Sequence, residues 1–352
     1  MITTLPFTDS QNNLLSSCFN STAAAYKFYW FISLIEEIEK GNYLLQKQHL
    51  FAGMIANSWY TVNYFNINLG KQDQLQRAIK QIIVTENISI DEKKHVIIET
   101  LKKSQFSNIK KILSHFDAEV PHRFLSPWFP SLKGNKKEIY RLSQYFHNNC
   151  LYAVNEQEVK INPTWTSYLT QNSGILKAFC YWHLGIYLQK HNPNVPDIPN
   201  KLIKSPKRNN LTKQRKEFWN IVIEHTGPIR CIYTGKMLTN DYAIEHFIPY
   251  SFVSHDLIWN LIPADKSFNK SKCDKLPPMD KYFDAYFEIQ ERGLKTILEH
   301  RHDSKFLEHY LTFIPDLASI HTMRRELLKE RFKGNIQPLV TIAGNNGFEF
   351  MM

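Results

Sequence analysis

The segment from Arg230 to Lys275 constrains the fold more than any other part of this sequence. Short apolar stretches alternate there with turn signals: RCIYTGKML, DYAIEH, SFVSHD, WNLIP and ADKSFNKSKCDKL follow one another. Tyr-Thr-Gly-Lys is typical of a β-turn, and Pro249 interrupts the chain after DYAIEH. We therefore expect a hairpin turn, two short strands joined through a loop at SFVSHD, and a helix that Pro277 and Pro278 prevent from continuing.

Five polar side chains in this segment are not needed by an ordinary core strand and helix. Glu245 and His246 are adjacent, Asn260 follows fourteen residues after His246, and Asn269 lies nine residues further on. Lys272 comes three residues after Asn269, on the same face of the expected helix. Carboxylate and amide oxygens suit a hard cation, and histidine ordinarily titrates near neutral pH. The order of these residues predicts a site that holds one cation beside a phosphodiester.

The remainder of the chain favours helices. Apolar residues recur at helical spacing in residues 21–41, 47–65, 71–86, 89–104 and 173–191, and again from 281 to roughly 333. Residues 156–169 contain one short expected strand, which Pro163 ends. The apolar tail from 336 to 352 has no pattern that places it. We expect a mainly α protein: a helical body (1–199), a basic linker (200–216), the strand-strand-helix module (217–280) and a C-terminal helical segment with its tail (281–352).

Positive charge is concentrated just before the module. The chain carries a formal net charge of +10, and residues 201–236 contain nine basic and two acidic residues. Such a cluster favours contact with a phosphate backbone, while a solvated flexible linker is the alternative. The expected nucleic-acid contacts are Arg208, Lys213, Arg215, Lys216 and Lys236.

Other features exclude several classes of protein. The five cysteines are scattered and none forms a C-x-x-C pair, so neither a disulfide framework nor a structural zinc site is indicated. The longest apolar run, FYWFISLI, is far shorter than the roughly 20 residues that a bilayer requires. The first residues lack the positive start and apolar core of a secretory signal. We expect a cytoplasmic protein.

The ordered set YTGK, EH, Pro249, WNL and N-x-x-K resembles the HNH endonucleases, which have the ββα-metal fold. The likeness is greatest to the HNH domain of the CRISPR RNA-guided effector nucleases, and it covers about 50 to 60 residues. The helical body resembles no family that we can name. The resemblance implies a metal-dependent DNA endonuclease that leaves 5′-phosphate and 3′-hydroxyl ends.

The resemblance also implies a role for each polar residue. His246 would be the general base that takes a proton from the attacking water. Glu245 and Asn269 would hold one Mg²⁺ or Mn²⁺ ion, Asn260 would fix the loop so that His246 keeps its orientation, and Lys272 would contact a phosphate. Aspartate is commoner than Glu245 in these relatives, which leaves the metal preference open. Many HNH proteins bind structural zinc through two cysteine pairs, which this chain lacks.

Several alternatives stay open at this point. His255, in the loop between the strands, is either exposed or a further ligand. The HNH fold is either an active nuclease or an inactive nucleic-acid-binding subunit of a larger complex, and RNA is a possible substrate. We expect double-stranded DNA as partner, and bacterial defence against foreign DNA as the setting. One HNH site cuts one strand, so a double-strand break requires a homodimer, two successive nicks or a partner protein such as an ATPase.

Overall fold

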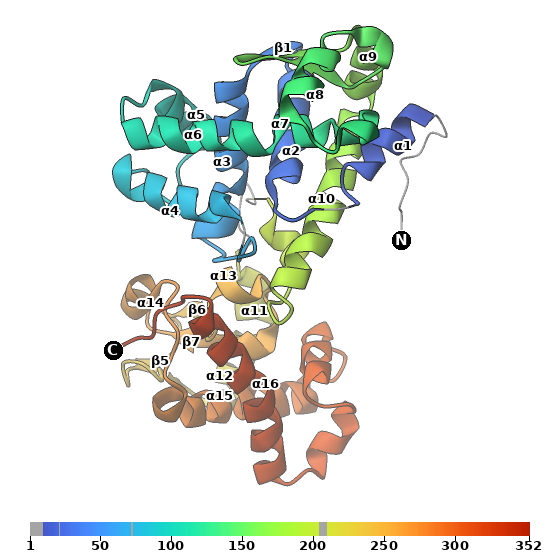
Figure 1. Cartoon of the computed structure of the whole chain (residues 1–352). Coiled ribbons are helices and arrows are strands. Elements are labelled where there is room, and N and C mark those ends of the chain that lie inside the picture. The colour runs from blue at the N-terminus through green and yellow to red at the C-terminus, as the bar shows by residue number, and fades with distance from the viewer. Residues whose placement is uncertain (1–9, 21, 72, 204–209) are drawn as a thin grey trace. The chain divides into compact units, whose positions relative to one another are not determined.

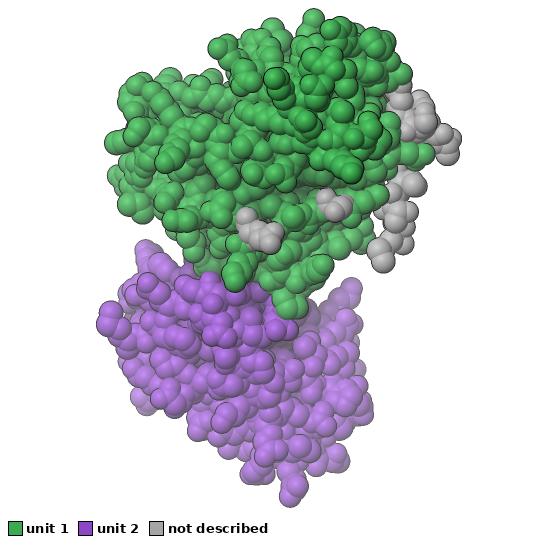
Figure 2. Space-filling view, in the orientation of Figure 1, with its two compact units in different colours: residues 1–193, 198–204 green, residues 194–197, 205–352 purple. Residues whose placement is uncertain are grey.

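The computed structural model describes residues 10–20, 22–71, 73–203 and 210–352 of the chain. The chain divides into two compact units (Figures 1 and 2), of which unit 1 comprises residues 1–193 and 198–204 and unit 2 comprises residues 194–197 and 205–352. Helices dominate both units, and the strands are short and antiparallel. The mainly α fold with a small strand-strand-helix module, predicted from the sequence, is confirmed.

The longer helices of unit 1 follow the apolar periodicities of the sequence. The described α-helices of this unit are α1 (Ser10–Ser17), α2 (Tyr26–Glu39), α3 (Lys47–Asn63), α4 (Gln74–Thr85), α5 (Lys94–Lys103), α6 (Ser107–Glu119), α7 (Pro121–Phe124), α8 (Lys136–Ser143), α9 (Pro163–Gln171) and α10 (Ser173–His191). Helix α2 is apolar on more than one side and packs against both α3 and α10. Its Trp30 is fully buried and donates a hydrogen bond to the Tyr152 hydroxyl at 3.0 Å.

A three-stranded antiparallel sheet lies at one end of unit 1 (Figure 1). Its strands are β1 (Leu44–Gln46), β2 (Tyr152–Val154) and β3 (Glu158–Ile161), in the order β1-β3-β2. In the register, Leu45 pairs with Val159. The strand expected before Pro163 is β3, whereas β1 and β2 were not expected.

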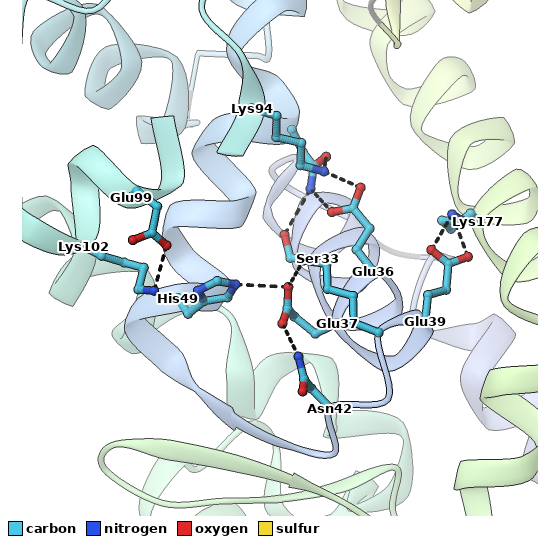
Figure 3. A network of polar contacts seen from close by, with 12 residues as sticks. Ser33, Glu36, Glu37, Glu39, Asn42, His49, Lys94, Glu99, Lys102 and Lys177 are labelled. Carbon is cyan, nitrogen blue, oxygen red and sulfur yellow. Dashed lines mark hydrogen bonds and ion pairs between the residues drawn. The ribbon is translucent and has the colours of Figure 1, made fainter. Parts of the chain in front are cut away.

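A polar network fastens α2 to its neighbours (Figure 3). Glu36 forms an ion pair with Lys94 at the start of α5. Glu37 lies 3.0 Å from Nε2 of His49 on α3 and accepts a hydrogen bond from Asn42 at 2.9 Å. Because each carboxylate already has partners, we interpret this network as structural.

Unit 2 contains the segment that carries the motif. Its described elements are α11 (Thr212–Gln214), the π-helix η5 (Arg215–Trp219), α12 (Asn220–Thr226), β4 (Ile229–Arg230), β5 (Met237–Leu238), β6 (Ala243–His246), α13 (Tyr250–Val253), η6 (Ile258–Asn260), β7 (Leu261–Ala264), α14 (Lys266–Lys272), α15 (Met279–His300), η7 (Lys305–Thr312), η8 (Leu317–His321) and α16 (Arg325–Asn345). Strands β4 and β5 form one hairpin, and β6 and β7 form another.

Three local features of unit 2 differ from expectation. Residues 251–253, expected as the start of a loop, belong instead to the one-turn helix α13, in which the N–H groups of Phe252 and Val253 donate to the Pro249 carbonyl at 2.9 and 3.1 Å. Helix α16 continues to Asn345 with Pro338 inside it, well beyond residue 333. The tail then pairs with the module, since the Leu276 N–H donates to the Glu349 carbonyl at 2.8 Å.

All five cysteines are free thiols, and Cys273 alone among them is exposed. Within the described ranges, no helix is both long and apolar enough to cross a membrane.

Candidate active site

The β6–β7 hairpin presents the adjacent acid and histidine. Glu245 pairs with Ile262 and His246 with Leu261 in the antiparallel register. Both polar side chains are buried, with 7% and 4% of Glu245 and His246 exposed. Helix α14 follows β7 directly and packs beside β6. Strand, strand and helix therefore enclose one polar centre.

The start of α14 is fixed by a capping carboxylate. Asp265 accepts a hydrogen bond from the Ser267 N–H at 2.9 Å, and its other oxygen lies 3.0 Å from Nζ of Lys236. Hydrogen bonds from the Ser267 side chain and from Lys236 hold the pKa of Asp265 below its ordinary value. An ionised N-cap satisfies helix N–H groups that would otherwise lack partners. Lys236, expected as a nucleic-acid contact, therefore also anchors the helix that carries Asn269.

Asn260 clamps the chain that leaves His246. Its Oδ1 accepts from the Ile248 N–H, its Nδ2 donates to the Ile248 carbonyl, and both distances are 2.8 Å. Its own carbonyl accepts from the Phe247 N–H at 2.7 Å. The Asn260 side chain is fully buried. These three bonds fix the backbone directly after His246.

Helices that follow the motif hold the backbone on either side of Asn260. Gln290 of α15 donates to the carbonyls of Ile258 and Leu261 at 3.2 and 2.9 Å. The Ile258 N–H donates to Nδ1 of His309 at 3.0 Å, and Tyr310 donates to Gln290 at 2.7 Å. Residues beyond 280 thus contribute to the geometry of the site.

Asp256 contacts the histidine of the motif. Its Oδ1 lies 2.9 Å from Nε2 of His246, and its side chain is 20% exposed. Sequence reasoning considered the neighbouring His255 instead, whose ring lies against Trp259 at 5.2 Å between centroids. The contact of Asp256 with His246 depends on the conformation of the loop between α13 and η6, which residue spacing in the sequence does not predict.

Lys272 turns inward rather than toward solvent. Its Nζ lies 2.8 Å from Oε1 of Glu245 and 2.8 Å from the carbonyl oxygen of His246. The Lys272 side chain has no exposed surface. An ammonium group with three donors is well matched to these two acceptors. In this structure Lys272 is the counter-charge of Glu245, and its contact with a phosphate stays a prediction.

Asn269 lies one turn before Lys272 on α14. Residues three apart on a helix share a face, so Asn269 is on the side of α14 from which Lys272 reaches β6. The Asn269 side-chain amide takes part in no hydrogen bond within the described part of the chain, and the residue is partly exposed. Asn269 is therefore one turn away from the lysine that contacts Glu245, on the same side of α14.

The donor set fits a hard divalent ion. Glu245 retains Oε2, which accepts no hydrogen bond from any described residue, and Asn269 offers an amide oxygen. Mg²⁺ is commonly bound by one or two such oxygens, with water and substrate phosphate filling the other positions. Across the described ranges, no three His, Cys, Asp or Glu side chains gather as a metal cluster.

The Tyr233 hydroxyl is a further unused polar group near this centre. It is buried and has no hydrogen-bond partner among the described residues. Burial, and then the negative charge of Glu245, raises the pKa of Tyr233 well above its ordinary value. Its ring stacks on Phe268 of α14, with centroids 4.6 Å apart. Burying a hydroxyl without a hydrogen-bond partner is unfavourable, so Tyr233 has an unused capacity for a hydrogen bond at this position.

The expected nucleic-acid contacts are placed differently from one another. Lys213 and Lys216 are exposed near the start of unit 2. Arg215 instead packs over the Tyr242 ring, with its guanidinium carbon 4.6 Å from the centroid. Arg208 lies outside the described residues. The exposed lysines keep the capacity to contact phosphates, whereas the Arg215 stack ties η5 to the strand region.

Comparison with known proteins addresses this segment only. No curated protein and no solved structure matched the chain. Residues 231–278 match the model of the HNH endonuclease family. HNH nucleases generally use a divalent metal and act on nucleic acid. The matched range includes β6, β7 and α14, with every polar residue of the motif. Residues 231–278 are therefore similar to the HNH endonuclease family, and they lie within a mainly helical protein.

Proposed function

We propose that this protein is a metal-dependent DNA endonuclease of HNH type, which hydrolyses phosphodiester bonds to 5′-phosphate and 3′-hydroxyl ends. One observation supports the proposal: Glu245, next to His246 on β6, contacts Lys272 of α14, which lies one turn after Asn269. Apolar residues can often replace a buried ion pair without loss of stability, so an acid and a histidine buried next to each other favour a functional role. The family match gives the same segment a nuclease origin.

His246 acts as the general base. A carboxylate accepts hydrogen bonds and cannot donate them, so an ionised Asp256 places the imidazole proton on Nε2. Nδ1 then has the lone pair that takes a proton from the attacking water. Asn260 holds the backbone on the C-terminal side of His246 through Ile248. The imidazole is thus oriented both by its side-chain partner and by its backbone.

Glu245 and Asn269 would hold the ion. A bound Mg²⁺ or Mn²⁺ neutralises charge that develops on the phosphate and on the departing 3′ oxygen. The two side chains supply only part of an octahedral set, which leaves positions for water and a phosphate oxygen. Asp256 lies on His246 rather than on Glu245, so we assign it to orientation of the base.

Exposed lysines would bind the duplex. Lys213 and Lys216 are exposed in the same unit as the site, and Arg208 belongs to the same basic stretch of sequence. Lysine contacts to phosphates give affinity without sequence preference and make binding salt-dependent. Double-stranded DNA is the proposed substrate.

A second candidate follows from the Lys272 ion pair. A carboxylate already neutralised by a buried ammonium is also what a nuclease fold without activity would contain. In that case the protein binds nucleic acid as a subunit of a larger complex and does not cut it.

The two candidates separate in a nicking assay. Supercoiled plasmid is incubated with Mg²⁺ or Mn²⁺ and either the wild-type protein or His246→Ala, and labelled RNA and DNA duplexes are run in parallel. The proposal expects metal-dependent nicking of DNA that His246→Ala loses, because the base contributes about 10²- to 10⁴-fold to such a reaction. Equal products from both proteins would show a contaminating nuclease and contradict the proposal.

A further inference from the structure

Lys272 and Glu245 form the most deeply buried ion pair of the motif. Lys272 has a side-chain exposure of 0% and Glu245 of 9%, and Nζ lies 2.8 Å from Oε1. A second bond from Nζ to the His246 carbonyl, also 2.8 Å, keeps the ammonium from swinging away. Moving a charged group out of water is unfavourable. Such a group stays charged in a protein interior only when an opposite charge compensates it. Each of these two groups is therefore the principal partner of the other.

The pair bears directly on the affinity of the site for cations. Glu245 is the carboxylate that the proposed function assigns to the metal, and within the described ranges it belongs to no group of three or more His, Cys, Asp or Glu side chains that could hold an ion. A divalent ion that approaches Glu245 Oε2 meets the positive charge of Lys272 on the same carboxylate. Repulsion between like charges is strong where water is excluded. Asn269 is neutral and cannot offset it.

We propose that Lys272 is the resident counter-ion of the metal site: it holds the Glu245 carboxylate in place when no ion is bound, and it lowers the affinity of the free protein for divalent metal. This inference rests on the proposed function, in which Glu245 is a metal ligand. The negative charge of a bound phosphodiester offsets the charge of Lys272, so the site takes up its ion more tightly with DNA than without it. Lys272 is a positioning residue in this account, because it acts through Glu245.

The test measures metal binding rather than cleavage. Mn²⁺ is titrated into DNA-free protein and followed by electron paramagnetic resonance, for the wild type, for Lys272→Met and for Lys270→Met. Methionine matches the length of lysine and suits a buried position, and Lys270 is an exposed lysine of the same helix. We expect Lys272→Met to bind Mn²⁺ at least about tenfold more tightly than the wild type, because a like charge next to the ligand is removed. Lys270→Met should match the wild type.

Thermal stability gives a second measurement of the role of the Lys272–Glu245 ion pair. Without metal, Lys272→Met should unfold at a lower temperature than the wild type, since Glu245 loses the ammonium group that pairs with it. Saturating Mn²⁺ should raise the unfolding temperature of Lys272→Met by more than it raises that of the wild type. Mn²⁺ affinity in Lys272→Met that is equal to or weaker than in the wild type would overturn the inference.

A measurement on folded protein decides the matter if Lys272→Met does not fold. The Mn²⁺ affinity of His246→Ala is compared with and without a DNA duplex. We expect Mn²⁺ to bind at least about tenfold more tightly with DNA, because the phosphodiester offsets the positive charge of Lys272. An unchanged affinity would contradict it.

Failure of the proposed function looks different. If Glu245→Gln binds Mn²⁺ as the wild type does, Glu245 is no ligand and both ideas fall. If Glu245→Gln loses Mn²⁺ while Lys272→Met gains nothing, only the role of Lys272 is wrong.

Discussion

Nε2 of His246 lies 2.9 Å from Oδ1 of Asp256, ten residues later in the chain. The histidine comes from strand β6 and the aspartate from the loop that follows α13. With His246 almost fully buried and Asp256 at the edge of solvent, the pair joins the interior of the site to its surface. Such a contact fixes both the ring orientation and the nitrogen that carries the proton.

We expect substitution of Asp256 to lower the cleavage rate without weakening DNA binding. Asp256→Ala removes the partner of Nε2, so kcat should fall by about 10- to 100-fold, a part of what a general base contributes. KM should stay nearly unchanged, because Asp256 has no assigned contact with DNA. Asp256→Asn, which still offers an acceptor oxygen, should retain more activity than Asp256→Ala. Steady-state kinetics test this prediction, and Asp303→Ala, a substitution at an exposed aspartate, is the control. A change in KM alone would refute the orienting role of Asp256.

Asn260 should be essential for stability as well as for activity. Asn260→Ala leaves the buried N–H and carbonyl of Ile248 without partners, at about 1–3 kcal/mol for each group. We therefore expect the free energy of unfolding to fall by about 2–6 kcal/mol in urea denaturation. Asn240→Ala, at an exposed asparagine, should change it little. Equal stability of the two variants would show that the clamp is not required.

His309 should make the stability of the site depend on pH. Burial lowers the pKa of His309 from 6.5, although Glu308 acts in the opposite direction, and its Nδ1 accepts the hydrogen bond from Ile258. A base whose pKa is depressed by folding binds fewer protons in the folded than in the unfolded state. Its contribution to stability is therefore complete above about pH 6.5 and is lost as the pH falls below that value.

His309→Asn tests this dependence. The asparagine oxygen can accept the Ile258 hydrogen bond but does not titrate. Between about pH 7 and pH 5, thermal unfolding temperatures of the wild type should fall more steeply than those of His309→Asn. Parallel curves for the two proteins would exclude His309 as the titrating group.

Exposed lysines should control the salt dependence of DNA binding. Lys213→Gln and Lys216→Gln should each reduce the slope of log affinity against log salt concentration by about 1, since each lysine releases one counterion from a phosphate. The loss of affinity should be similar for duplexes of different sequence. Lys305→Gln, an exposed lysine after α15, is the control, and a slope unchanged in all three variants would remove the two lysines from the interface.

The sequence predicted elements whose signals are local. The long apolar periodicity of residues 173–191 became α10 with the same bounds, and the motif became β6, β7 and α14. Pairings between distant segments left no comparable signal. Leu44–Gln46 pairs with Glu158–Ile161 across more than a hundred residues, and the tail pairs with Leu276. The composition of one segment does not indicate which distant segment it pairs with.

Within the site, the sequence identified residue types better than their contacts. Glu245, His246 and Asn269 stood out because of their spacing. The inward orientation of Lys272 depends on how α14 packs against β6, and the contact of Asp256 with His246 depends on the turn after α13. Both are consequences of tertiary packing, which a spacing pattern does not contain.

Single-turnover cleavage of an end-labelled DNA duplex tests the central claim most directly. Rates are measured across a Mg²⁺ titration for the wild type, Glu245→Gln and Asn269→Ala, with Lys305→Gln as a control. The account predicts Mg²⁺-dependent cleavage with 5′-phosphate ends by the wild type and the control, and a loss of about 100-fold or more in the other two variants. Cleavage by Glu245→Gln and Asn269→Ala at the wild-type rate and with the same Mg²⁺ dependence would contradict it.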